Sequence, residues 1–82
     1  MRYSDKKVEI DIHGMTVEEA KLRLTIELSR VGYDVGEITV IHGYHGGRAL
    51  MNFVRWEFKH PRLRRVRYTD NYGESVLVLN PY

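Results

Sequence analysis

The stretch VEIDIHG, residues 8–14, decides the first half of the fold. Apolar side chains alternate in it with polar ones, which is the period-2 pattern of a strand that buries one face. The polar set includes Asp11 and His13, which therefore lie on the same face, roughly 6 to 7 Å apart. Gly14 ends the pattern, so we expect a strand over residues 8–13.

A helix is predicted directly after this strand, over residues 17–30. Thr16 and Glu19 form the S/T-x-x-E capping box that opens helices. Glu19 is also placed to pair with Arg23 four residues on, and Gly32 suits a left-handed C-terminal cap. The residues expected to form the buried stripe of this helix are Ala20, Leu24, Leu28 and Val31.

The middle of the chain predicts a second strand and a second helix. Residues 38–41 form a β-rich apolar run, expected to be buried on both sides, which ends at His42. Residues 43–47 are too rich in glycine for regular structure, and they lead into a helix over residues 48–59 that Pro61 stops. The side chains of this helix expected to face the core are Leu50, Phe53, Val54 and Phe58.

Two further strands complete the prediction. Residues 63–69 and 75–79 are β-like runs joined by a turn-rich segment, as in a hairpin. The first is charged like an edge strand, and the second is apolar on both faces like a central one. The order βαβαββ predicts an α/β (α+β) two-layer sandwich, with a four-stranded mixed sheet and two helices on one face. We expect one domain over residues 8–82, after a tail of residues 1–7.

Composition restricts the class of protein. The chain has 82 residues, of which 43% are hydrophobic and 29% charged, as expected of a single globular domain. It has no cysteine, which rules out a disulfide framework and fits a reducing compartment. The start of the sequence lacks the apolar core of a signal peptide, and no apolar run is long enough to span a bilayer. We therefore expect a cytoplasmic protein without membrane insertion.

Charge is distributed unevenly. Residues 1–47 carry eight acidic and six Lys or Arg side chains, whereas residues 48–82 carry three acidic and seven basic ones. The second half is therefore where a polyanion is expected to bind, unless its charges form only a solvated surface.

Two motifs resemble those of the small MutS-related (Smr) domain family. The first is residues 10–14, with Thr16 and Glu19-Ala20 after it, and it resembles the family's leucine-Asp-x-His-Gly strand end. The second is residues 42–47, which resembles the family's His-Gly-x-Gly-x-Gly loop. The chain departs from the family at Ile10, where leucine is usual, and at His45, which replaces the middle glycine of the loop.

The resemblance implies a fold similar to the C-terminal domain of bacterial translation initiation factor three, with sheet order 1-2-4-3. It also implies binding of RNA or DNA, with endonuclease activity in some members. The expected partners, besides nucleic acid, are a ribosome or a repair or recombination complex. On its length, the chain is expected to be an independent Smr-domain protein.

The candidate catalytic residues are Asp11, His13 and His42. A βαβ crossover lays the second strand beside the first, so the two histidines should converge at one edge of the sheet. With RNA as substrate, we expect His13 to act as the base, supported by Asp11, and His42 as the acid, without a metal. The alternative is that both histidines cap strand ends and bond to loop backbone.

Nucleic acid is expected to contact the glycine loop and a basic surface. The loop glycines and Arg48 precede a helix N-terminus, which favours a phosphate, and the second helix carries a basic stripe that charged residues farther along the chain extend. The exposed faces of Tyr44, Trp56 or Tyr68 could stack on bases. The predicted binding residues are Gly14, Gly43, Tyr44, His45, Gly46, Gly47, Arg48, Asn52, Arg55, Lys59, Arg64, Arg65 and Arg67, with Arg62 adding to the positive surface. The alternative is a turn that needs glycine for steric reasons and a solvated charged face.

No cofactor is expected, although Asp11, His13, His42 and His45 are residue types that hold zinc or manganese. Three functions therefore compete: an endonuclease that prefers RNA, a non-catalytic DNA- or RNA-binding module, and an adaptor that docks a partner protein through its aromatic side chains and hairpin edge.

Overall fold

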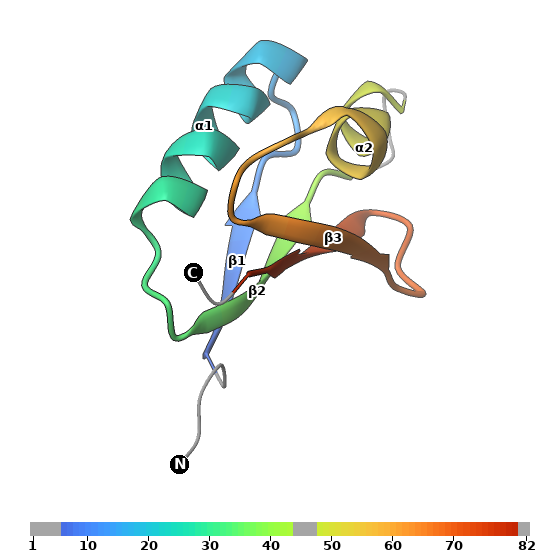
Figure 1. The fold of residues 1–82 in the computed structure, drawn as a ribbon. Coiled ribbons are helices and arrows are strands. Elements are labelled where there is room, and N and C mark those ends of the chain that lie inside the picture. The colour runs from blue at the N-terminus through green and yellow to red at the C-terminus, as the bar shows by residue number, and fades with distance from the viewer. Residues whose placement is uncertain (1–5, 44–47, 81–82) are drawn as a thin grey trace.

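The computed structural model describes residues 6–43 and 48–80 as a four-stranded sheet with two helices on one side (Figure 1). The element order βαβαββ agrees with the prediction. The elements are β1 (Lys6–Asp11), α1 (Val17–Arg30), β2 (Val35–Ile41), α2 (Ala49–Asn52), the π-helical η1 (Phe53–Glu57), β3 (Leu63–Tyr68) and β4 (Glu74–Leu79). No helix within the described residues is long and apolar enough to cross a membrane.

The sheet has the order β1-β2-β4-β3, which confirms the predicted topology. β1 and β2 are parallel, whereas β4 runs antiparallel to both of its neighbours. The apolar β4 is central, and its residues 75–77 are all buried. The arginine-rich β3 is an edge strand, whose charged side chains remain in solvent.

The sequence patterns of β1 and α1 explain how these elements form. Ile10 and Ile12 are buried against the helices, whereas the alternating residues Glu9, Asp11 and His13 are exposed. The capping box is present: the Glu19 N–H donates to Thr16 Oγ1 over 3.1 Å, and the Thr16 N–H donates to Glu19 Oε1 over 2.9 Å. These bonds satisfy two of the backbone donors that a helix start leaves free, and α1 begins at the predicted residue.

Two expectations for α1 are wrong. Glu19 does not pair with Arg23, because its carboxylate belongs to the capping box; Arg23 Nε donates to Glu27 Oε2 instead, over 3.2 Å. Gly32 does not form a left-handed cap either. The helix ends in an extended residue, Val31, with φ −68° and ψ 147°.

The second helix is shorter than predicted and changes its winding after Asn52. It ends at Glu57 rather than at residue 59, and the Phe58 N–H donates to the Phe53 carbonyl over 2.8 Å, which is the i→i+5 bond of a π-turn. This bond brings Phe53 and Phe58 to a ring separation of 5.7 Å, and both are buried. Phe53 and Phe58 are five residues apart, and an α-helix would place them on different faces. The π-turn places both side chains in the core.

Strand β2 is longer than predicted and is buried mainly on its helix side. Ile38 and Val40 are fully covered, whereas Thr39 and Ile41 between them are half-buried. The core therefore lies between the sheet and the helices. It is formed by Ile10, Ile12, Ala20, Leu24, Leu28, Val35, Ile38, Val40, Phe53, Val54, Phe58, Leu77 and Leu79, with Val31 and Leu50 partly buried against them.

Candidate active site

The two motifs meet where β1 and β2 end. Asp11 pairs with Ile41 across the parallel ladder, and the Ile12 N–H donates to the Ile41 carbonyl over 2.9 Å, so the residues that follow both strands emerge side by side. Gly43 has φ +74°, and a Cβ on it would lie 3.4 Å from the Cβ of His13. The strand ends that carry the two predicted histidines are therefore adjacent at one edge of the sheet, and Gly43 is the residue of the second motif that lies against His13.

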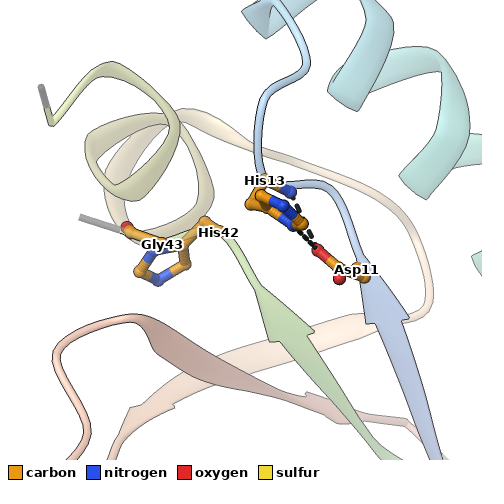
Figure 2. A network of polar contacts seen from close by, with 4 residues as sticks. All are labelled: Asp11, His13, His42 and Gly43. Carbon is orange, nitrogen blue, oxygen red and sulfur yellow. Dashed lines mark hydrogen bonds and ion pairs between the residues drawn. The ribbon is translucent and has the colours of Figure 1, made fainter. Parts of the chain in front are cut away.

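Asp11 and His13 form a hydrogen-bonded pair at the surface (Figure 2). Asp11 Oδ1 accepts from the His13 Nδ1–H over 2.5 Å and from the His13 backbone N–H over 3.0 Å. These two bonds, with that of the side chain dominant, lower the pKa of Asp11 below its ordinary value of 3.8. The His13 and Asp11 side chains are 69% and 52% exposed, so a large substrate can reach them.

This geometry determines which nitrogen of His13 is available. Because Asp11 accepts the proton of Nδ1, the lone pair of the neutral ring lies on Nε2. Within the described residues, no hydrogen bond to Nε2 of His13 is formed. A carboxylate that fixes the tautomer of an exposed imidazole is an arrangement suited to accepting a proton from a bound molecule.

His42 lies beside this pair but is buried, with 3% exposure. Its Nδ1–H donates to the Gly43 carbonyl over 2.9 Å, and its Nε2 accepts from the Ser75 hydroxyl over 3.0 Å. Burial lowers the pKa of His42, and the positive charge of Arg55 lowers it further against the opposing effect of the bond to Gly43. Figure 2 shows the ring turned toward Gly43, whereas the ring of His13 is directed toward Asp11.

These contacts do not suit His42 as a proton donor to a substrate. An acid must carry the proton and reach the leaving oxygen, whereas this ring favours its neutral form and uses both nitrogens inside the protein. Its bond to the Gly43 carbonyl instead fits the alternative interpretation, in which a histidine bonds to loop backbone.

Ser75 is a site-supporting residue that sequence reasoning missed. It is fully buried, and its Oγ accepts from Arg55 Nε over 2.8 Å while donating to His42. Arg55 also donates from Nη2 to the Glu74 carbonyl over 3.3 Å, and its Cζ lies 4.4 Å from the ring centre of Tyr68. A serine inside an otherwise apolar central strand was the available signal, because a buried hydroxyl requires partners.

The predicted basic stripe is interrupted. Arg48, Asn52 and Lys59 are exposed, but Lys59 lies beyond the end of η1, and Arg55 is engaged in the buried network. Arg62 likewise turns inward, and its Nη1 donates to the Val31 carbonyl over 2.7 Å. The interruption has two causes: the helix ends before Lys59, and the guanidinium of Arg55 donates to Ser75.

The remaining predicted residues fall into two groups. Arg64, Arg65 and Arg67 are exposed on β3, and Arg67 Nη2 bonds to Glu37 Oε1 over 3.0 Å. Gly14 is exposed near the pair, with φ +84° and no atom within 4 Å of a Cβ built on it. The predicted loop residues Tyr44, His45, Gly46 and Gly47 lie outside the described residues.

The sequence left open a metal site formed by Asp11, His13, His42 and His45. In residues 6–43 and 48–80, no group of three or more His, Asp or Glu side chains is arranged to hold a metal ion. His45, the fourth ligand-type residue considered, lies outside those ranges.

Comparison with known proteins agrees with the predicted fold. No family model matches the chain. No curated protein sequence matches it either. The structure is similar to the crystal structure of the Smr domain of Thermus thermophilus MutS2, with a TM-score of 0.73 and 26% identity over 90% of this chain and 99% of that chain. The chain therefore has the fold of an Smr domain, and the two motifs that resemble those of the Smr family lie at one edge of its sheet.

Proposed function

We propose that this chain binds nucleic acid and cleaves RNA at the Asp11–His13 pair. The observation that carries the proposal is the 2.5 Å bond between Asp11 Oδ1 and His13 Nδ1, which orients an exposed imidazole whose Nε2 forms no hydrogen bond with the described residues. The resemblance of both motifs to the Smr family, in which some members are endonucleases, supports the same site.

In the proposed reaction, Nε2 of His13 takes the proton of a ribose 2′-hydroxyl. The 2′-oxygen attacks the adjacent phosphorus and the bond from phosphorus to the 5′-oxygen breaks, which leaves a 2′,3′-cyclic phosphate and a 5′-hydroxyl end. Asp11 keeps the ring in the required tautomer and stabilises the imidazolium that forms, since its lowered pKa keeps it charged.

The proton for the leaving 5′-oxygen comes from solvent in this scheme. His42 was the predicted donor, but its buried and hydrogen-bonded ring makes it a positioning residue. It holds the Gly43 carbonyl, and Gly43 in turn lies against the Cβ of His13. In the described part of the site, His13 is thus the exposed imidazole, and the buried His42 supports it.

The basic side chains of β3 and Arg48 supply the charge that retains a polyanion. Arg64, Arg65 and Arg48 are exposed, and the segment from residue 48 onward has the excess of positive charge. Binding through phosphates predicts an affinity that falls steeply with salt, whereas docking of a partner protein predicts a weak dependence. A ribosome or a repair complex could present such a strand, and this assignment, like the cytoplasmic location, stays a prediction.

The test is cleavage of an end-labelled RNA and its all-deoxy counterpart by the wild type, Asp11→Asn and His13→Ala. Glu9→Gln is the matched control, because Glu9 is an exposed acid on the same face of β1. We expect RNA to be cut to cyclic-phosphate ends, the deoxy strand to stay intact, and both site variants to lose about 100-fold or more in rate. A wild type that binds RNA without cutting it, or variants that cut equally well, would leave a non-catalytic binding module.

A further inference from the structure

Two grooves flank Arg55 on the side of the sheet that carries the helices. One, of about 300 Å³, lies between the end of the second helix and β3, and its lining includes Trp56, Lys59 and Tyr68. The other, of about 400 Å³, is lined by Arg48, Met51, Arg55 and Tyr72. Because Arg55 lines both, the two grooves adjoin at its side chain.

Each groove presents aromatic rings to solvent. Trp56 is 64% exposed, Tyr72 72% and Tyr68 47%, which is a large apolar area to leave uncovered. Trp56 meets Tyr68 edge to face at 5.9 Å between ring centres, with an interplanar angle of 76°. Arg55 lies over the Tyr68 ring, so these side chains form an ordered platform.

The positive charge of the groove linings favours a negatively charged ligand. Among the described residues, the linings include no acidic side chain and five cationic ones, namely Arg48, Arg55, Lys59, Arg64 and Arg65. Aromatic faces between cationic side chains are suited to a ligand that alternates flat rings with negative charges. A nucleic acid strand has this chemistry, with bases that stack on the rings and phosphates that meet the cations.

We infer that the two grooves bind consecutive parts of one unpaired nucleic acid strand, which crosses Arg55 with bases against Trp56 and Tyr72. A single strand is required because the bases of a duplex already stack on each other and offer no free face to a side chain. The inference rests on the proposed function for the identity of the polymer, and it adds that the substrate is single-stranded where the protein contacts it.

The Tyr72 groove is connected to the candidate active site through the backbone. The carbonyl of Gly73, the residue after Tyr72, accepts from the N–H groups of His42 and Gly43 over 2.9 and 2.8 Å. Gly43 in turn lies against His13. A strand held at Tyr72 therefore lies near the backbone of His42 and Gly43, which adjoins His13, and the Trp56 groove lies farther along the strand.

Trp56 is the only tryptophan of the chain, so its fluorescence reports directly on one groove. We expect a short oligouridylate to quench this fluorescence and an RNA duplex of equal length to leave it unchanged. Quenching by the duplex at the same concentration, or none by the single strand, would overturn the inference.

The contribution of each aromatic ring to binding affinity is measured from the fluorescence anisotropy of a labelled oligouridylate. Trp56→Ala and Tyr72→Ala should each weaken binding about 10-fold, and Trp56→Phe should restore most of the loss, because a phenyl ring still stacks. Tyr33→Ala is the matched control, since Tyr33 is 67% exposed but lines neither groove. Equal weakening by Tyr33→Ala, or none by the groove variants, contradicts the inference.

The outcome separates this inference from the proposed function. If Trp56→Ala binds and cuts as the wild type does while Asp11→Asn is inactive, the groove is not used and the nuclease stands. If Asp11→Asn cuts normally while the groove variants bind weakly, the strand-binding grooves stand and the catalytic assignment fails.

Discussion

The imidazole of His42 and the hydroxyl of Ser75 lie 3.0 Å apart in the protein interior, although 33 positions separate them in the sequence. Arg55 Nε completes the chain of contacts by donating to the same hydroxyl. Because Oγ both accepts and donates, the three polar groups satisfy one another without a charge on His42. The Gly43 backbone is therefore positioned by a buried network, separate from the exposed Asp11–His13 pair that it supports.

Removing the hydroxyl at the centre of this network should destabilise the fold. Ser75→Ala leaves Arg55 Nε and His42 Nε2 without their shared partner, so we expect the free energy of unfolding to fall by about 1 to 3 kcal/mol. Urea denaturation measures the change. Ser29→Ala is the control, since that hydroxyl is exposed and its loss should cost less than about 0.5 kcal/mol. Equal effects of the two substitutions would show that the network contributes no stability.

The lowered pKa of His42 predicts that stability depends on pH. The unfolded chain has the ordinary histidine pKa of 6.5 and the folded chain a lower one, so the unfolded state binds more protons between the two values. The contribution to stability is full above pH 6.5 and is lost as the pH falls through the folded pKa. Denaturation midpoints measured from about pH 8 to about pH 5 should show this loss.

His42→Gln isolates that contribution, because glutamine cannot titrate in this range. The difference in unfolding free energy between wild type and variant should shrink as the pH decreases below 6.5. A difference that stays constant with pH would mean that His42 titrates equally in both states.

The backbone was the most predictable part of this molecule. The capping box at Thr16 and Glu19 indicated the start of α1, because this signal is local. The apolar and charged runs indicated that β4 is central and β3 an edge strand, whereas the full sheet order followed from the resemblance to the Smr family. The Asp11–His13 pair was also foreseeable, since residues two apart on a strand share a face.

The unpredicted features depend on contacts between residues far apart in sequence. The π-turn forms because Phe53 and Phe58 share one core site, and no local propensity signals it. The inward turn of Arg55 depends on Ser75, which lies 20 positions away. The periodicity of the charged residues therefore predicted that Arg55 lies on a solvent-exposed basic stripe, whereas its contact with Ser75 in the folded protein removes it from that stripe.

The two left-handed glycines provide a test of how the motifs contact each other. Gly43→Ala and Gly14→Ala each force a side chain to positive φ, at a cost of about 1 to 2 kcal/mol. The new methyl at Gly43 also lies 3.4 Å from the His13 Cβ, whereas that at Gly14 meets nothing within 4 Å.

Both variants should therefore lose similar stability, but RNA cleavage should fall further in Gly43→Ala, because only there does the new methyl contact His13. Thermal unfolding and cleavage rates are measured on the same preparations. Similar cleavage losses would indicate that the contact between Gly43 and His13 has no part in the reaction.

The arginines of β3 should differ in their contribution to binding. Arg64 is exposed, whereas Arg67 already bonds to Glu37 and is partly neutralised. We expect Arg64→Gln to reduce the slope of log affinity against log salt for a single strand by about 0.7, as one lost phosphate contact requires. Arg67→Gln should reduce it less. Anisotropy titrations at several salt concentrations measure both slopes, and a larger effect of Arg67→Gln would reverse this order.

The position of β4 has a consequence for synthesis of the chain. β4 is the last strand in sequence, yet it occupies an interior place between β2 and β3. Until the ribosome has released residues through Leu79, β3 has no partner in the sheet, and His42 lacks Ser75. The nascent chain therefore carries Asp11 and His13 long before Ser75 can support the neighbouring His42, so assembly of the buried network is delayed until β4 joins the sheet.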